Sequence, residues 1–256
     1  MTDGLFDVTG RVALVTGSSA GIGYALARGL LAHGAEVVVN GRREQALEEA
    51  AAALAAETGR APHVMAFDVT VTEQVDTAVA RIEAEIGPLE ILVNNAGAQH
   101  RTPIQDFTDD DWDRLIALNL TSAFLVGRAA ARVMIPRGHG KIVNICSVQS
   151  ETVRPGIAPY SATKGGLKQL TKGMCADLGP HGIQVNGLGP GYIETDLTAA
   201  LVADPQFSAW VAGRTPAGRW GTVDDLVGPL LFLVSSASDF VTGQVLYADG
   251  GMLSVL

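Results

Sequence analysis

Short apolar runs alternate with longer helical patterns along the whole chain, and this alternation limits the fold more than any single residue does. Strands are expected near residues 11–17, 35–40, 63–67, 89–93, 141–146, 182–189 and 244–248. Helical patterns lie between them, near residues 22–32, 44–57, 72–86, 109–134, 159–178 and 222–235. Because parallel strands need a crossover between them, the alternation predicts an α/β fold with one parallel sheet and helices on both faces.

Length and composition narrow the class further. The chain has 256 residues and no evident linker or repeat, so a single domain over residues 1–256 is expected. A net charge of −9 argues against general nucleic-acid binding, which needs a basic surface. No apolar run reaches the roughly 20 residues of a membrane span, and no signal peptide is evident. Two cysteines do not suggest a structural disulfide, so a cytoplasmic protein is expected.

Tyr160 and Lys164 form the pair with the clearest chemistry. If they lie on a helix, their spacing puts them on one face, roughly 5–6 Å apart at Cβ. An ammonium that close favours the phenolate and should lower the pKa of the tyrosine from about 10, which would suit a general acid or base. Ser147 upstream could hydrogen-bond the same oxygen that the phenol protonates. The alternative is a chance pair on a surface helix.

A glycine-rich turn, Gly17-Ser-Ser-Ala-Gly21-Ile-Gly23, follows the first predicted strand and leads into a helix. Glycines let a backbone approach an anion, and helix N–H groups face it, so the turn predicts a phosphate site. The spacing is GxxxGxG and not the common GxGxxG. A tight turn that needs positive φ is the alternative.

The end of the second predicted strand indicates which dinucleotide would be preferred. In a Rossmann unit an acidic residue there would hydrogen-bond the adenosine ribose, but here Gly41, Arg42 and Arg43 follow the strand. Guanidinium groups suit a 2′-phosphate, which favours NADP over NAD. Two arginines that merely start an exposed helix are the alternative.

Polar residues also follow or interrupt other predicted elements. Asp68 could accept from an adenine amino group or cap the next helix. Asn94-Asn-Ala-Gly97 would suit a flat ligand or form an ordinary turn. Asn119, among leucines on a helical face, needs a partner because an unpaired buried polar group is costly, and it is either a structural amide or part of a polar relay. The irregular segment at about 192–221 predicts a substrate lid or pocket wall.

Taken in order and at this spacing, the motifs resemble the short-chain dehydrogenase/reductase family over almost the whole length. The matching stretches are TGSSAGIG at 16–23, Asn94–Gly97, Asn119, Ser147, Tyr160xxxLys164, and Pro190-Gly191 with Thr195. Further stretches, KIVNICSVQSE, RPGIAPY, HRTPIQDF, RTPAGRWG and DGGMLSVL, resemble in particular bacterial members of the family that act on a sugar acid.

The resemblance implies a doubly wound, Rossmann-type parallel sheet of about seven strands, and a homotetramer. It implies that Tyr160 is the acid/base and that Lys164 lowers its pKa and holds the nicotinamide ribose. It also implies that Ser147 orients the substrate oxygen and that Asn119 anchors a water-linked proton relay. Cofactor contacts are implied for Gly17, Ser19, Gly21, Ile22, Gly23, Asp68, Val69, Asn95, Ala96, Gly97, Pro190, Gly191, Ile193 and Thr195.

One position departs from the family pattern. Many NADP-using relatives carry a basic residue just before the second glycine of the turn, where this chain has Ala20. A 2′-phosphate would then depend mainly on Arg42, with Ser18 or Arg43 as further candidates. NAD remains an alternative cofactor.

A sugar acid needs a counter-charge for its carboxylate. Arg101 and Arg154 are candidates, because an arginine can bind a carboxylate through two parallel hydrogen bonds. His100 is a third candidate, and Gln149 and Glu151 could bind hydroxyls. The alternative for both arginines is a solvated loop charge or a subunit contact. Other candidate functions are reduction of a 3-oxoacyl thioester, a polyol or a xenobiotic ketone, and non-catalytic sensing of NADP. No metal site is expected.

Overall fold

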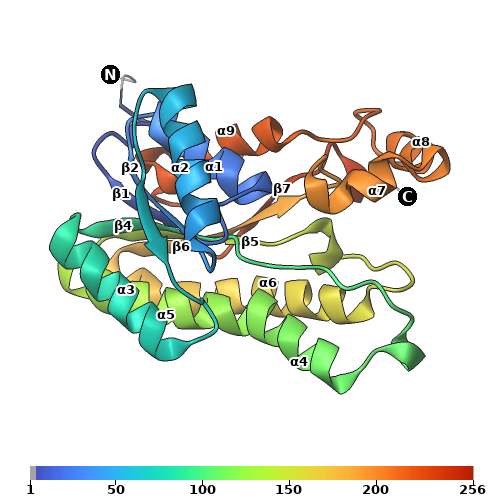
Figure 1. Ribbon diagram of the computed structural model, residues 1–256, viewed down its shortest axis with the longest axis horizontal. Coiled ribbons are helices and arrows are strands. Elements are labelled where there is room, and N and C mark those ends of the chain that lie inside the picture. The colour runs from blue at the N-terminus through green and yellow to red at the C-terminus, as the bar shows by residue number, and fades with distance from the viewer. Residues whose placement is uncertain (1–3, 256) are drawn as a thin grey trace.

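The structure, a computed structural model, describes residues 4–255. Its centre is a parallel sheet of seven strands in the order β3-β2-β1-β4-β5-β6-β7, so the predicted doubly wound sheet is confirmed (Figure 1). The strands are β1 (Val12–Val15), β2 (Glu36–Gly41), β3 (His63–Ala66), β4 (Leu89–Asn94), β5 (Gly140–Ile145), β6 (Ile183–Pro190) and β7 (Val245–Ala248).

Helices cover both faces of the sheet (Figure 1). One face carries α1 (Gly21–Ala32), α2 (Glu44–Thr58) and α9 (Val227–Val234). The other face carries α3 (Thr72–Glu85), α5 (Ser122–Met134) and α6 (Ala158–Leu178). The remaining helices are α4 (Asp109–Ile116), α7 (Ala199–Val202) and α8 (Pro205–Arg214).

The central strands read as continuous apolar runs because both of their faces are covered. Every residue of β1 and of β5 is buried, whereas β3 and β7 at the two edges are partly exposed. This is the burial expected of a parallel sheet between two helical layers.

The strand order reverses between β1 and β4, which lie side by side although β2 and β3 come between them in the chain. In open parallel sheets, ligands bind outside the carboxyl ends of the strands at such a switch point. The turns that the sequence singled out follow these ends: Gly17–Gly23 after β1, Asn95–Gly97 after β4, Ser147 after β5 and Gly191–Thr195 after β6.

The helical pattern expected at 109–134 is present but is not one regular α-helix. A π-helical turn, Ala117–Thr121, separates α4 from α5 and contains Asn119. Such turns often occur at functional positions. By length and hydropathy the stretch Asp109–Arg137 could cross a membrane. However, 56% of its most apolar part is buried inside the fold, as in the core helices of a globular protein.

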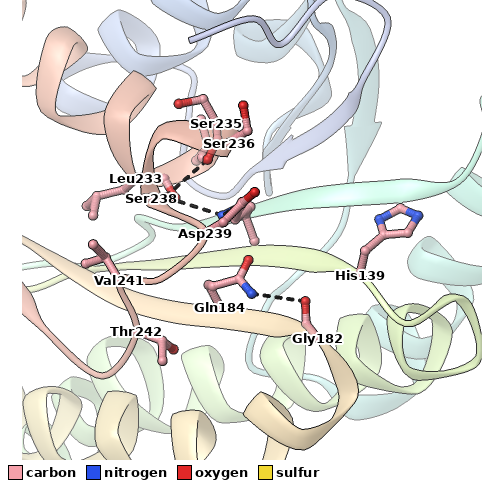
Figure 2. Close-up of polar contacts among 12 residues, drawn as sticks. His139, Gly182, Gln184, Leu233, Ser235, Ser236, Ser238, Asp239, Val241 and Thr242 are labelled. Carbon is pink, nitrogen blue, oxygen red and sulfur yellow. Dashed lines mark hydrogen bonds and ion pairs between the residues drawn. The ribbon is translucent and has the colours of Figure 1, made fainter. Parts of the chain in front are cut away.

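An ion pair between a buried lysine and an exposed aspartate lies at the amino-terminal end of the sheet. Lys141, on β5, is 4% exposed, and its Nζ donates to Asp239 Oδ1 at 2.7 Å and to Ser238 Oγ at 3.4 Å. Figure 2 shows Ser238 and Asp239 next to each other on the segment that follows α9, with the hydrogen bond from Ser238 back to Ser235. This segment therefore covers the end of the sheet opposite the switch point.

Candidate active site

A cavity of 690 Å³ lies at the carboxyl ends of the strands, where the strand order reverses. Its volume falls within the range of small-molecule and cofactor sites. It brings together most of the predicted site residues: Gly17, Gly21, Ile22, Gly23, Arg42, Asp68, Val69, Asn95, Ala96, Gly97, Arg101, Ser147, Arg154, Tyr160, Lys164, Pro190, Gly191, Ile193 and Thr195. The other candidate residues do not line it: Ser18, Ser19, Arg43, His100, Asn119, Gln149 and Glu151.

The turn after β1 lets the backbone approach closely. Gly17 has a φ of +62°, and a Cβ there would lie 2.8 Å from the Cα of Ala96. A Cβ on Gly23 would lie 2.4 Å from the side-chain nitrogen of Asn95. Helix α1 begins at Gly21 without a side-chain cap, so its first N–H groups are available to an anion in the cavity.

Arg42 and Asp68 lie together on the cavity wall. Arg42 Nη1 is 3.9 Å from Asp68 Oδ2, and the arginine side chain is 74% exposed. Burial raises the pKa of Asp68, but hydrogen bonds from Thr70 and the charge of Arg42 outweigh it and hold that pKa below its usual value. An exposed guanidinium with one distant carboxylate partner is available to a phosphate.

Asn40, on β2, is a site residue that sequence reasoning missed. It is 1% exposed and lines the cavity. Its Oδ1 accepts from the Gly17 N–H at 3.4 Å, and its Nδ2 donates to the carbonyls of Met65 and Phe67 at 3.3 and 3.1 Å. The side chain therefore ties the glycine turn to β3. In the sequence, the feature that could have pointed to Asn40 was a single amide side chain at the end of an apolar run.

Ser147, Tyr160 and Lys164 reach the cavity from two elements. Ser147 follows β5, and Tyr160 and Lys164 stand one turn apart on α6. Lys164 Nζ lies 5.8 Å from the centroid of the Tyr160 ring, so the predicted shared helix face is present. Ser147 Oγ accepts from the Gln149 N–H at 3.1 Å, which leaves the hydroxyl proton free to donate into the cavity.

Lys164 carries a buried charge without a carboxylate partner among residues 4–255. It is 6% exposed, and its Nζ donates to the carbonyl oxygen of Ile145 at 2.6 Å. The Ser150 hydroxyl donates to the Lys164 carbonyl at 2.9 Å, which fixes this turn of α6 to the segment after β5. The ammonium is therefore held in place with donors left for a ligand.

Asn119 does not line the cavity, but it holds the loop after β4 in place. Its Nδ2 donates to the Ala98 carbonyl at 2.9 Å and to Thr163 Oγ1 at 3.3 Å. Its Oδ1 accepts from the Ala98 N–H at 2.8 Å. The partner that the sequence required is thus the backbone of Ala98, and Thr163 links the amide to α6.

Arg101 and Arg154 place two guanidinium groups in the same cavity. Arg101 donates to Gln99 Oε1 at 3.1 and 2.8 Å. Burial, followed by the charge of Arg154, lowers the pKa of Arg101. Two like charges share one half-enclosed space, and neither has a carboxylate partner within residues 4–255. This arrangement favours an anionic ligand.

The remaining predicted substrate contacts point elsewhere. Gln149 is buried and does not line the cavity. Glu151 binds Lys168 Nζ and accepts from the Tyr247 hydroxyl at 2.6 Å. His100 packs edge-on against Phe107, with ring centroids 5.0 Å apart. A direct role of these three in substrate binding stays a prediction.

Comparison with known proteins identifies the family. A family model described as "Enoyl-(Acyl carrier protein) reductase" matches residues 17–253. The gluconate 5-dehydrogenase of Gluconobacter oxydans (strain 621H) is 56% identical over 248 residues, which cover 97% of this chain and 96% of that protein. The chain belongs to the short-chain dehydrogenase/reductase family. It is therefore an oxidoreductase, as the resemblance of its motifs implied.

Two further members of the short-chain dehydrogenase/reductase family are similar over nearly all of their length. The 5-keto-D-gluconate 5-reductase of Escherichia coli (strain K12) is 48% identical, with 97% of this chain and 98% of that protein covered. A gluconate 5-dehydrogenase from Burkholderia cenocepacia J2315, solved in complex with NADP and tartrate, is 54% identical with a TM-score of 0.95, and 98% of each chain is covered.

Proposed function

We propose that the chain is an NADP-dependent oxidoreductase that interconverts D-gluconate and 5-keto-D-gluconate. The observation that carries this proposal is one cavity that holds Ser147, Tyr160 and Lys164 together with the guanidinium groups of Arg101 and Arg154, which have no carboxylate partner within residues 4–255. The first set suits proton transfer at a hydroxyl or carbonyl oxygen, and the second suits a carboxylate on the same small molecule. The relatives named for gluconate and 5-keto-gluconate support this substrate.

The cavity fits a dinucleotide phosphate. The tight approach of Gly17 to Ala96 and the uncapped start of α1 would accept the pyrophosphate, and Arg42 would bind a 2′-phosphate. Further contacts would come from residues at or after the carboxyl ends of β3, β4 and β6: Asp68, Val69, Asn95, Ala96, Gly97, Pro190, Gly191, Ile193 and Thr195. The cofactor, when bound, supplies hydride to the substrate carbonyl or accepts it in the reverse direction.

The side chains of Ser147, Tyr160 and Lys164 carry out the proton transfer. In reduction, Ser147 Oγ donates a hydrogen bond to the carbonyl oxygen while negative charge develops there, and the Tyr160 hydroxyl gives that oxygen its proton. The Lys164 ammonium stabilises the phenolate that remains. Oxidation reverses each transfer. Asn119 holds the loop after β4 through Ala98, and we assign it the anchoring of a water-linked relay that returns a proton to Tyr160.

We also infer that the segment 192–221 is a lid and that the enzyme is a cytoplasmic homotetramer. Large apolar side chains remain exposed on α4, on α5 and near β7, which supports subunit contacts there: Trp112, Phe124, Phe240 and Leu246. Light scattering of the purified chain measures the assembly, and a monomer at micromolar concentration contradicts it.

One assay tests the reaction. NADPH and NADH oxidation are followed with 5-keto-D-gluconate, an acetoacetyl thioester and a neutral ketone. We expect the highest kcat/KM with NADPH and 5-keto-D-gluconate. The matched variant Tyr160→Phe keeps NADPH binding and loses turnover by about 10²–10⁴-fold. Binding of NADPH without turnover of any carbonyl would instead favour a non-catalytic sensor of NADP. A preference for the thioester would indicate a 3-oxoacyl thioester as the substrate in place of a sugar acid.

A further inference from the structure

Four aromatic side chains join the two ends of the lid, residues 192–221. Tyr192 lies at its centre, with ring centroids 5.6 Å from Phe207, 5.7 Å from Trp210 and 5.6 Å from Trp220. Trp220 is 8% exposed, and its Nε1 donates to Ser208 Oγ at 3.2 Å. The start of the segment, α8 and the residues before its end therefore pack as one unit, which we call the lid cluster.

Arg154 connects the lid cluster to the segment that carries Ser147. Its guanidinium carbon lies 5.4 Å from the centroid of the Phe207 ring, over the ring face. Arg154 is half-buried and also lines the cavity. A cation at this distance from an aromatic face is attracted to it, most strongly where water is partly excluded. The face of the Phe207 ring therefore attracts the Arg154 guanidinium, which has no carboxylate partner within residues 4–255.

The second guanidinium of the cavity has a different support. Arg101 is held by Gln99, on the loop after β4, and not by the lid. Burial raises the pKa of Tyr192, while the charge of Arg154, a hydrogen bond from Arg154 and the charge of Arg101 lower it, so both guanidinium groups lie near this phenol. One cation is therefore attached to the body of the fold, and the other rests on the lid.

We propose that Phe207 is a positioning residue which holds Arg154 beside Arg101, so that the lid makes substrate selection depend on a carboxylate. This rests on the proposed function and extends it from the reaction to its selectivity. A carboxylate between the two guanidinium groups joins the lid to the body of the fold through charge-assisted hydrogen bonds. A neutral hydroxyketone lacks that link and leaves the two cations repelling each other.

The test compares an acid with a matched neutral substrate. Steady-state kinetics are measured with NADPH on 5-keto-D-gluconate and on its methyl ester. We expect Phe207→Leu to raise KM for the acid by about three- to tenfold, the range expected for loss of a partly desolvated cation–aromatic contact. KM for the ester and kcat for both substrates should change by less than about twofold. Phe207→Trp keeps an aromatic face and should restore the acid KM.

A matched control removes a ring from the same cluster without a guanidinium over it. Trp210→Leu should leave the acid-to-ester ratio of KM unchanged. If Phe207→Leu raises both KM values equally, or leaves the acid KM unchanged, Phe207 only packs the lid and the proposal is overturned.

A binding measurement separates this proposal from the proposed function. Tartrate, a small dicarboxylate, is titrated calorimetrically into the chain with NADP present. We expect Phe207→Leu to weaken tartrate binding by about three- to tenfold. Wild-type chain that binds tartrate but reduces neither ketone would refute the gluconate activity and leave the positioning of Arg154 standing. Equal tartrate affinity in wild type and Phe207→Leu would refute the positioning alone.

Discussion

Lys141 lies on β5, and Lys164 on α6 contacts the end of the same strand; both are almost fully buried, at 4% and 6% exposure, but their surroundings differ. Lys141, at the amino end of the strand, donates to the Asp239 carboxylate and to Ser238. Lys164, at the carboxyl end, donates to the backbone carbonyl of Ile145. One charge is neutralised by the fold, and the other is left for a ligand.

This difference teaches how one sheet can serve stability at one end and chemistry at the other. A buried charge that already has a counter-ion attracts a charged ligand only weakly, because the counter-ion cancels most of its electric field. A buried ammonium held by a neutral carbonyl keeps its field, and here that field acts on the Tyr160 ring at 5.8 Å. We therefore expect substitutions at the two lysines to separate turnover from stability.

The largest expected effect is on turnover at the carboxyl end. Lys164→Met should lower kcat for 5-keto-D-gluconate by about 10²–10⁴-fold, because Tyr160, the proposed acid/base, loses the positive charge 5.8 Å from its ring centroid. The Tm should change by only a few degrees, because the variant also removes a buried charge that lacks a counter-ion. Steady-state kinetics and thermal unfolding of the purified variant measure both quantities.

Lys141→Met is the matched control, with the same substitution at the other end of β5. It should keep kcat within about threefold of the wild type, because Lys141 does not line the cavity. Retention of more than a tenth of the activity in Lys164→Met, or an equal loss in both variants, would break the distinction between the two lysines.

The next effect is on stability at the amino end. Asp239→Asn leaves the Lys141 ammonium buried with Ser238 as its side-chain partner. The Asp239 side chain is 67% exposed, so water partly replaces it, and we expect a loss of about 1–2 kcal/mol in the free energy of unfolding. That corresponds to a Tm lower by about 2–8 °C.

Urea unfolding and kinetics of Asp239→Asn check this, with kcat expected within about twofold of the wild type. The double variant Lys141→Met with Asp239→Asn removes both charges and should recover part of the lost stability. A normal Tm in the single variant would mean that the ion pair does not stabilise this end of the sheet.

The sequence alone predicted the elements and the motifs, because those depend on neighbours in the chain. Hydrophobic periodicity located the strands, and the glycine turn, Ser147 and Tyr160 with Lys164 all lie in the cavity as expected. The π-helical turn that contains Asn119 was not predicted, and neither was the hydrogen bond between Asn119 and Ala98, because these two residues are 21 positions apart in the chain.

Contacts between distant residues were beyond sequence reasoning. Asp239 lies 98 residues after Lys141, so no local pattern tells which lysine has a counter-ion. Arg154 was a candidate for substrate binding, but its support on Phe207 depends on how the lid packs. The same holds for Asn40, whose role appears only when the turn after β1, β2 and β3 lie together.

The smallest expected effect is the pH dependence of stability at Lys141. Burial, reinforced by Arg11, lowers the pKa of Lys141 below its ordinary 10.5, although Asp239 opposes the shift. Between the lowered pKa and 10.5 the unfolded chain binds more protons than the folded chain, so the free energy of unfolding rises with pH in that window. The penalty for burying the ammonium is present at neutral pH and is lost as the pH rises through the lowered pKa.

Urea unfolding of wild type and Lys141→Met from neutral pH to about 10 isolates this contribution. Other groups, such as Tyr247, contribute equally in both chains and cancel in the difference; burial and Glu151 raise the pKa of Tyr247 above this range in the folded chain. We expect the stability of the wild type relative to Lys141→Met to increase with pH. A difference that falls with pH would show that Asp239 outweighs burial in setting the pKa of Lys141.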